Sequence, residues 1–172
     1  TAAISYMITN RFQPHSVYTM ELAQRGDLLT HNKDQAVLTL LNIQQIIEKN
    51  FITLNIDMNL GDVIHEGVIK SSRNLFPVID ENRNFLGIIL LDDIRPIMFD
   101  QKMYDDVKVS DIMQRAPATI DLRKDRPKDT MRKFQETNAW NLPVVEDGKY
   151  VGFISKSKLL TAYRQKLIEV TV

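Results

Sequence analysis

The side chains in this sequence that could carry out chemistry are few and widely spaced. Paired acids such as Asp92-Asp93 and Asp105-Asp106 are direct neighbours, which points their carboxylates in different directions rather than toward one substrate. The six glycines are dispersed and form no phosphate-cradling loop. The chain has no cysteine, which excludes disulfides, thiolate chemistry and cysteine-ligated metal sites. Because an enzyme needs an activated nucleophile, an acid–base pair or a metal, we expect no catalytic activity and no catalytic residue.

Histidines and net charge narrow the function further. His15, His31 and His65 lack metal-ligand spacing, so we expect no metal site and take all three as solvated or structural. Lys+Arg and Asp+Glu both total 22, and the resulting net charge of zero gives no global field toward nucleic acid or an anionic membrane. The sequence has no apolar run of roughly 18 residues to span a bilayer, and no signal peptide is visible.

A pattern typical of a β-hairpin occurs twice, over residues 75–89 and 141–154. Each copy has a short β-branched run opened by a proline, then a polar turn and a second apolar run. In the second copy Asp147-Gly148 supplies the positive φ that a tight hairpin turn needs. The sequence therefore predicts two hairpins of the same design.

The repeat extends beyond the hairpins. The offset that aligns Pro77 with Pro143 also aligns residues 43–47 with residues 109–113. The first turn is one residue longer, so Gly87 aligns with Gly152. Both glycines lie in the returning strands, where a glycine indicates a bulge or a close backbone approach. Two copies are too few for a solenoid, which favours a paired module.

These copies resemble a tandem pair of CBS domains (cystathionine-β-synthase domains, a Bateman module) over roughly residues 43–166. The residues that carry the resemblance are "DIM" and the later threonine, "PVV" before an acidic turn, "VGFIS" after it, and the following amphipathic helix. The resemblance implies an α+β fold (α/β, CBS-type) of two β-α-β-β-α repeats packed about a pseudo-twofold axis, with an N-terminal helical arm. The expected parts are the arm 1–42, repeat 1 at 43–98, a connector 99–108 and repeat 2 at 109–172.

Helix caps can be assigned within this frame. Asn59 is expected to cap a helix running to about Lys70, and Asp125 to cap the helix of the second repeat, with Pro127 in its first turn. Helices are also expected after each hairpin, over residues 92–98 and 156–167, with apolar surface left exposed. That surface is expected at Leu159, Leu160, Tyr163 and Leu167.

The N-terminal segment suggests a membrane-protein parent. "AISYMIT" reads as the end of an apolar helix, Pro14 breaks it, and short helices are expected over residues 17–25 and 34–41. "AISYMIT" followed by "PHSVYTMELAQRG" resembles the junction after the last membrane helix of CLC chloride channels and transporters. The resemblance implies a homodimer on the cytoplasmic face of the cell (inner) membrane, joined to the transmembrane portion of the same chain, with no nucleic-acid partner. Residues 1–13 are expected to be poorly anchored.

The CBS resemblance also implies ligand chemistry. Adenine-nucleotide-binding copies carry a glycine, two apolar residues, a serine or threonine and then an aspartate, whose oxygens accept the ribose hydroxyls. Here Asp93 keeps the carboxylate but Leu90 replaces the hydroxyl, while Ser155 keeps the hydroxyl but Lys158 replaces the acid. Neither copy is intact, so ATP, ADP or AMP is expected at most as a weak regulatory ligand, and no cofactor is required.

The resemblance builds each cleft from both repeats. The first would combine Asp93, Thr119, Trp140 and Asn141. The second would combine Thr53, Arg73, Asn74, Ser155 and Lys158. The first keeps the ribose carboxylate and a ring that could stack on a base, which favours it for adenosine. The second is cationic and suits a phosphate or another anion.

Three functions stay open at this point. The chain could be the regulatory module of a CLC protein, controlling gating or transport through its dimer interface. It could be a nucleotide-sensing CBS module of another transporter or enzyme. It could also be a structural dimerisation domain with empty clefts. Ligand titration separates the second from the third.

Overall fold

The computed structural model describes residues 36–171, with side chains to residue 170. Residues 36–40 are helical, within the helix expected over 34–41. The other N-terminal predictions, namely the helices over 1–10 and 17–25 and the weak anchoring of residues 1–13, lie outside the described residues. Among the helices that are described, none is long and apolar enough to cross a membrane.

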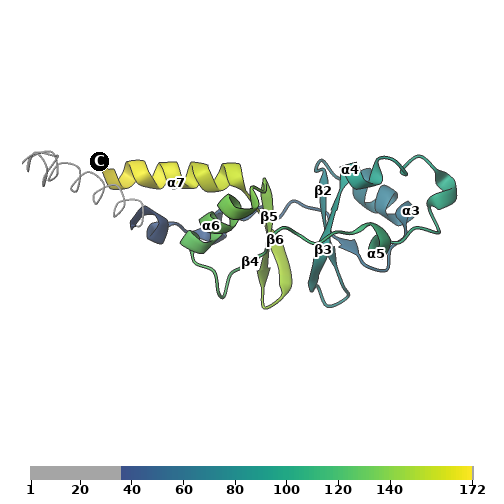
Figure 1. The fold of residues 1–172 in the computed structure, drawn as a ribbon, viewed down its shortest axis with the longest axis horizontal. Helices are drawn as coiled ribbons and strands as arrows, with labels where there is room; N and C mark the ends of the chain where they lie inside the picture. The colour runs from purple at the N-terminus through teal and green to yellow at the C-terminus, as the bar shows by residue number, and fades with distance from the viewer. Residues whose placement is uncertain (1–35, 172) are drawn as a thin grey trace, which may run out of the picture.

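Two small mixed sheets form the centre of the molecule (Figure 1). In the first, β1 is parallel to β2 and β2 is antiparallel to β3; β4, β5 and β6 repeat this arrangement in the second. The strands are β1 (Leu54–Asn55), β2 (Leu75–Ile79), β3 (Phe85–Leu90), β4 (Ile120–Asp121), β5 (Asn141–Glu146) and β6 (Lys149–Ser155). Both predicted hairpins are present, and the predicted α+β fold of two equivalent units is confirmed.

The helices lie on the outer sides of the two sheets, so that the hairpins face each other in the middle (Figure 1). They are α3 (Leu60–Asp62), which continues as the π-helix η2 (Val63–Val68), α4 (Leu91–Ile94), α5 (Val109–Ile112), α6 (Pro127–Thr137) and α7 (Lys156–Thr171), with 3₁₀ turns η1 (Ile43–Ile46) and η3 (Gln101–Met103). α4 ends before the predicted residue 98, because Pro96 has no N–H to continue the helix. α7 runs past the predicted residue 167.

Asn59 begins the helix of the first repeat as predicted. Its Oδ1 accepts the N–H of Asp62 at 2.9 Å, and the Asp62 carboxylate accepts the N–H of Asn59 at 3.2 Å. This reciprocal pair satisfies two backbone donors that the first turn of a helix leaves without partners.

The prediction that Asp125 caps α6 is wrong. Arg126 holds the N-cap position, and its N–H donates to Asp129 at 3.1 Å. Pro127 takes the first helical position as predicted, which places the cap directly before it. Asp125 instead accepts the N–H of Asp121 at 2.7 Å and pairs with the ammonium of Lys133.

Each repeat completes the hairpin of the other. We call residues 47–50 and 113–116, which precede β1 and β4, the lead-in segments. Glu48 exchanges two backbone hydrogen bonds with Phe153, at 2.7 and 2.9 Å, and Gln114 exchanges two with Ile88, both at 2.9 Å. Because Glu48 and Gln114 occupy equivalent positions in the repeat, as do Ile88 and Phe153, these contacts have the expected pseudo-twofold symmetry.

The hairpin glycines allow this crossing. A Cβ atom on Gly152 would lie 2.6 Å from the carbonyl oxygen of Glu48, and one on Gly87 would lie 2.6 Å from that of Gln114. No real side chain tolerates such a distance. The close backbone approach predicted at both glycines is therefore confirmed, and each strand pair also shifts register there.

The two hairpin tips also meet across the pseudo-twofold axis. The N–H of Phe85 donates to the carbonyl of Gly148, and the N–H of Tyr150 donates to that of Arg83, both at 3.0 Å. The second turn has the positive φ that was predicted, 51° at Asp147 and 78° at Gly148. The tips therefore join the two sheets as well as reversing the chain.

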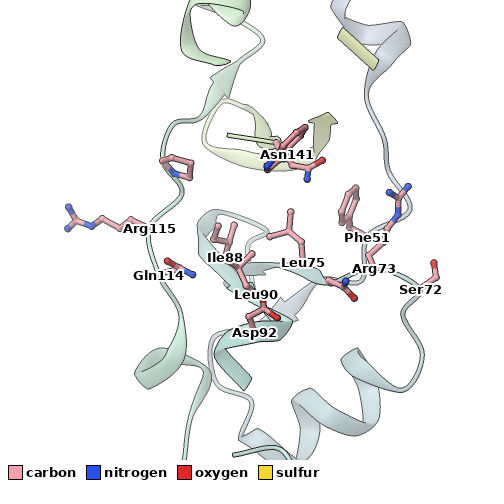
Figure 2. Close-up of a pocket in the computed structure, with 13 residues that line it drawn as sticks. Phe51, Ser72, Arg73, Leu75, Ile88, Leu90, Asp92, Gln114, Arg115 and Asn141 are labelled. Atoms are coloured by element: carbon pink, nitrogen blue, oxygen red, sulfur yellow. The ribbon is translucent and has the colours of Figure 1, made fainter. Parts of the chain in front are cut away.

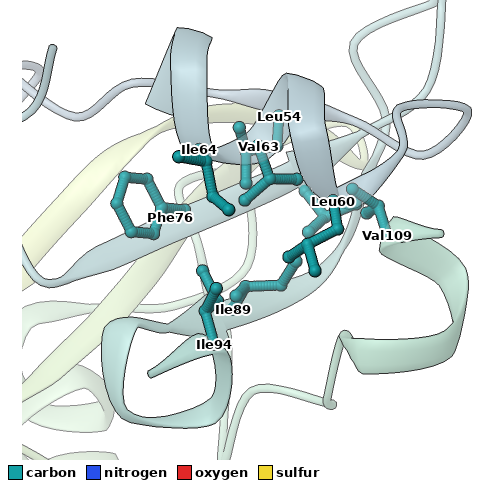
Figure 3. Packing of buried hydrophobic residues seen from close by; sticks show 9 residues of the cluster. Leu54, Leu60, Val63, Ile64, Phe76, Ile89, Ile94 and Val109 are labelled. Atoms are coloured by element: carbon teal, nitrogen blue, oxygen red, sulfur yellow. The ribbon is translucent and has the colours of Figure 1, made fainter. Parts of the chain in front are cut away.

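Within residues 36–171, three clusters of buried apolar side chains hold the fold. In the first repeat, residues from the α3–η2 helix pack on Phe76 and Ile89 of the sheet, and Ile94 and Val109 close the sides (Figure 3). A second cluster fills the other repeat and contains Leu159 at 0% exposure, so the prediction that Leu159 belongs to an exposed face is wrong. The third lies between the sheets and consists of Phe51, Leu75, Ile79, Ile88, Tyr150 and Phe153.

Candidate functional site

A cavity of about 710 Å³ lies between the two repeats (Figure 2). Its apolar lining comes from Phe51, Leu75, Ile88, Leu90 and Pro117. Leu75 and Leu90 are direct partners on β2 and β3, so the base of the first hairpin forms one wall. The polar lining adds Ser72, Arg73, Asn74, Asp92, Gln114, Arg115 and Asn141, and Trp140 completes it. An apolar slot that also carries polar side chains suits a planar ring with a polar substituent.

The loops before β2 and β5 both open into this cavity. They bring together Arg73, Asn74, Trp140 and Asn141. From the sequence, Trp140 and Asn141 are expected in one cleft and Arg73 and Asn74 in the other. Asn74 and Trp140 hold equivalent positions in the repeat, and both line this one cavity.

Trp140 lies at the mouth of the cavity with 77% of its surface exposed. Its carbonyl accepts the N–H of Lys156 at 2.8 Å, and the Lys156 ammonium lies 5.9 Å from the centre of the ring. An exposed tryptophan beside an apolar slot can stack on a planar ligand without displacing core side chains.

Asp93 serves the local structure rather than the cavity lining. Its Oδ2 accepts the N–H of Leu90 at 3.1 Å, which caps α4, and the side-chain amide of Gln114 at 2.8 Å. The neighbouring Asp92 lines the cavity instead and forms an exposed ion pair with Arg95 at 2.9 Å. Of the two adjacent acids, it is therefore Asp92 that lines the cavity.

The two candidate threonines also lie outside the lining. Thr53 and Thr119 directly precede the short strands β1 and β4. The carbonyl oxygen of Thr119 accepts a hydrogen bond from the Lys133 ammonium at 2.7 Å. A ligand role for either threonine stays a prediction.

Ser155 and Lys158, which the resemblance places in the second cleft, lie beside Glu48. The Lys158 ammonium is 3.7 Å from Glu48 Oε1, and Arg73 Nη2 donates to the same oxygen at 3.0 Å. Burial acts to raise the pKa of the Glu48 carboxyl, but hydrogen bonds from Arg73 and Ser155 and the charge of Lys158 outweigh it. The pKa of Glu48 is therefore lower than usual.

Sequence reasoning missed Asp92, Gln114 and Arg115 as lining residues. Gln114 and Glu48 are equivalent in the repeat, but nothing in the pattern shows that each lead-in segment crosses to the opposite hairpin. Arg115 is exposed, and Figure 2 shows its side chain directed away from the cavity. Over residues 36–171, no three His, Asp or Glu side chains are grouped so that they could hold a metal ion.

The comparison with protein families matches the CBS domain twice, over residues 43–100 and 109–165. The repeats predicted from the sequence run over residues 43–98 and 109–172, so both predicted repeats begin at the same residues as the two matches. A CBS domain-containing protein of Dictyostelium discoideum is 28% identical over 130 residues, which cover 69% of this chain and 88% of that protein. The tandem CBS pair predicted from the sequence is thus confirmed.

Solved structures share the fold. CbpB in complex with c-di-AMP aligns with a TM-score of 0.65 at 18% identity, covering 81% of this chain and 95% of CbpB. CBSX2 in complex with AMP aligns with a TM-score of 0.56 at 23% identity, covering 72% of this chain and 96% of CBSX2. At these identities the likeness establishes the shared fold but does not identify a ligand of this chain.

Proposed function

The chain belongs to the CBS-domain family, and from that membership we propose that it is a regulatory, non-catalytic module that binds an adenine nucleotide between its two repeats. The cavity lined by Leu75, Ile88 and Trp140 carries the proposal. Its volume of about 710 Å³ lies within the range usual for small-ligand sites. Two structures of the same fold were solved with adenine-containing ligands, AMP and c-di-AMP.

The base would occupy the apolar slot. Leu75, Ile88 and Leu90 offer one apolar wall, and the Trp140 ring is free to stack from the mouth. Asn74 and Asn141 border the same space and carry both donors and acceptors, which the edge of an adenine ring can pair with. This arrangement favours a purine over an aliphatic ligand.

Binding should be weak for two reasons. Leu90 has no hydroxyl for the ribose, and one missing neutral hydrogen bond costs roughly 0.5–1.5 kcal/mol. The Asp93 carboxylate is already engaged by Gln114 and by the N–H of Leu90. A site that is micromolar when intact would then fall toward the hundred-micromolar range, since about 1.4 kcal/mol corresponds to tenfold in affinity.

Titration calorimetry with AMP, ADP and ATP tests this function. We expect one weak site per chain, which Trp140→Ala removes by deleting the stacking ring. Phe99→Ala is a matched control, because Phe99 is an aromatic residue of similar exposure, 83%, that does not line the cavity. If all three nucleotides are silent at millimolar concentration, the module is a structural dimerisation domain instead.

We further propose that the module regulates a CLC-type chloride channel or antiporter from the cytoplasmic face of its membrane. The support is the sequence "PHSVYTMELAQRG" at residues 14–26, which precedes a CBS pair that begins at residue 43. Reading the coding sequence upstream of Thr1 tests this. Hydrophobic membrane helices there would support it, and a soluble enzyme domain would favour a nucleotide sensor of another protein.

A further inference from the structure

The two clefts contain the same pair of positions with exchanged charge. Gln114 and Glu48 are equivalent residues of the lead-in segments, and Asp93 and Lys158 are equivalent residues after the hairpins. On the cavity side, the Gln114 amide donates to the Asp93 carboxylate at 2.8 Å. In the second cleft the ammonium of Lys158 faces the carboxylate of Glu48 at 3.7 Å. The acid has thus moved from the hairpin side to the lead-in side.

Glu48 is surrounded by groups that bind anions. Arg73 Nη2 donates to its Oε1 at 3.0 Å, and the Lys158 ammonium forms an ion pair with the same oxygen at 3.7 Å. The Ser155 hydroxyl also hydrogen-bonds to the carboxylate. Arg73 is fixed in this direction, because its guanidinium packs 4.9 Å from the centre of the Phe51 ring and also donates to Asn50 at 2.9 Å. Only 10% of the Glu48 side chain is exposed.

We propose that the second cleft is an anion site that the chain fills with its own Glu48 carboxylate. A guanidinium, an ammonium and a hydroxyl form the donor set that recognises phosphate or carboxylate groups. The resident carboxylate satisfies that set, so the cleft accepts no phosphate-bearing ligand. This conclusion does not depend on whether the cavity binds a nucleotide.

The lead-in segment keeps Glu48 in place. Its backbone makes two hydrogen bonds to Phe153, so the side chain begins at a fixed point beside Arg73 and Lys158. A tethered group competes at an effective concentration in the millimolar range or above, beyond that of most free anions. A free phosphate would also have to leave Glu48 as an unpaired, largely buried charge, which is strongly unfavourable.

Removing the charge of Glu48 should open the site. In Glu48→Gln, Arg73 and Lys158 keep their positive charges, and the amide has the shape that Gln114 already has at the equivalent position. Inorganic phosphate, followed by calorimetry and by ³¹P line broadening, should then bind once per chain. We expect an affinity at least about tenfold higher than for the wild-type chain, which corresponds to about 1.4 kcal/mol.

Two further variants assign the effect to this cleft. Glu66→Gln makes the same change in net charge by breaking the exposed pair between Glu66 and Lys70, and it should bind phosphate no better than the wild-type chain. Glu48→Gln combined with Lys158→Gln should lose the gained binding. The proposal is overturned if Glu48→Gln and Glu66→Gln behave alike, or if the wild-type chain binds phosphate as tightly as Glu48→Gln.

A second measurement needs no substitution. In the wild-type chain, the Nη protons of Arg73 should give slowly exchanging NMR signals, because Glu48 and Asn50 hold the guanidinium. These signals should not move when phosphate is added to about one millimolar, which does not exceed the effective concentration at which a tethered group competes. A freely rotating guanidinium, or one whose signals shift with phosphate, would show that the cleft is open.

Discussion

The hydroxyl of Tyr150 is buried between the two sheets and has no hydrogen-bond partner among residues 36–171. Its ring is well packed, with centres 6.2 Å from Phe85 and 5.9 Å from Phe153. A buried polar group without a partner costs roughly 1–3 kcal/mol, so removing it can stabilise a protein.

Tyr150→Phe should leave the free energy of unfolding unchanged or raise it by about 1 kcal/mol. Tyr104→Phe is the matched control, because the hydroxyl of Tyr104 donates to the carbonyl of Met98 at 2.9 Å. That variant should lose about 1 kcal/mol, the usual worth of one hydrogen bond. Urea denaturation compares the two, and a clear loss in Tyr150→Phe would mean that its hydroxyl has a partner.

Tyr150 also predicts an alkaline effect. Burial raises the pKa of Tyr150 above its ordinary value of 10.0, because the folded state disfavours the phenolate. The unfolded chain therefore loses this proton first, and stability that is complete below about pH 10 is lost as the pH rises further. Between about pH 8 and pH 11, the midpoint temperature of thermal unfolding should fall less steeply with pH in Tyr150→Phe than in the wild-type chain. Equal slopes would contradict the assignment.

Gly152 gives a second expectation for a single residue. Gly152→Ala would place a Cβ 2.6 Å from the carbonyl oxygen of Glu48, so the lead-in segment must move. We expect a loss of about 1–3 kcal/mol in unfolding free energy, the usual cost of overpacking. Gly87→Ala should lose a similar amount, since the distance to Gln114 is the same. A loss below roughly 0.5 kcal/mol, typical of surface changes, would contradict the geometry.

At the level of elements, the sequence predicted well what depends on neighbouring residues. The hairpins follow from alternating apolar runs around Asp147-Gly148, and the start of α3 follows from a cap that Asn59 and Asp62 form within one turn. The cap of α6 was misassigned by one residue. Both Asp125 and Asp129 are acids near Pro127, and only the folded geometry shows which one meets the free N–H groups.

Asn59→Ala should shorten the helix of the first repeat. It removes the oxygen that accepts the N–H of Asp62, and the expected loss is about 0.5–2 kcal/mol of unfolding free energy. Asn59→Ser keeps a capping oxygen and should recover most of this loss. If the alanine and serine variants are equally stable by urea denaturation, the cap contributes nothing.

The candidate site could be predicted only in part, because it depends on how the elements meet. The loops carrying Arg73 and Trp140 were identified from the repeat. Their meeting in one cavity depends on the pseudo-twofold axis, and the roles of Glu48 and Gln114 depend on the crossing of the lead-in segments. Such contacts join residues far apart in the chain, and no local pattern encodes them.

The whole molecule leaves apolar side chains exposed on α7 and after α4. Leu160, Ile168 and Phe99 are 43%, 64% and 83% exposed, and Leu160 borders a groove of about 480 Å³ beside Tyr163 and Leu167. Exposed apolar helix faces of this kind are usual at twofold interfaces. We therefore propose that the chain forms a homodimer through α7.

Leu160→Glu should weaken this dimer, because it places a charge in the apolar contact. Light scattering at high micromolar protein should give a dimer mass for the wild-type chain and a lower mass for the variant. Leu86→Glu, at a similarly exposed leucine of β3, should keep the dimer mass. A monomer mass for the wild-type chain would rule the homodimer out.

Because the lead-in segments cross, each repeat supplies backbone hydrogen bonds to the hairpin of the other repeat. The half that ends before Asp106 keeps Glu48, which pairs with the second hairpin, and the remaining half keeps Gln114, which pairs with the first. The peptide bond between Asp105 and Asp106, both exposed, is therefore a natural split point. Two fragments expressed separately should reassemble on mixing, whereas either one alone would be left with an unsatisfied strand edge and a tendency to self-associate.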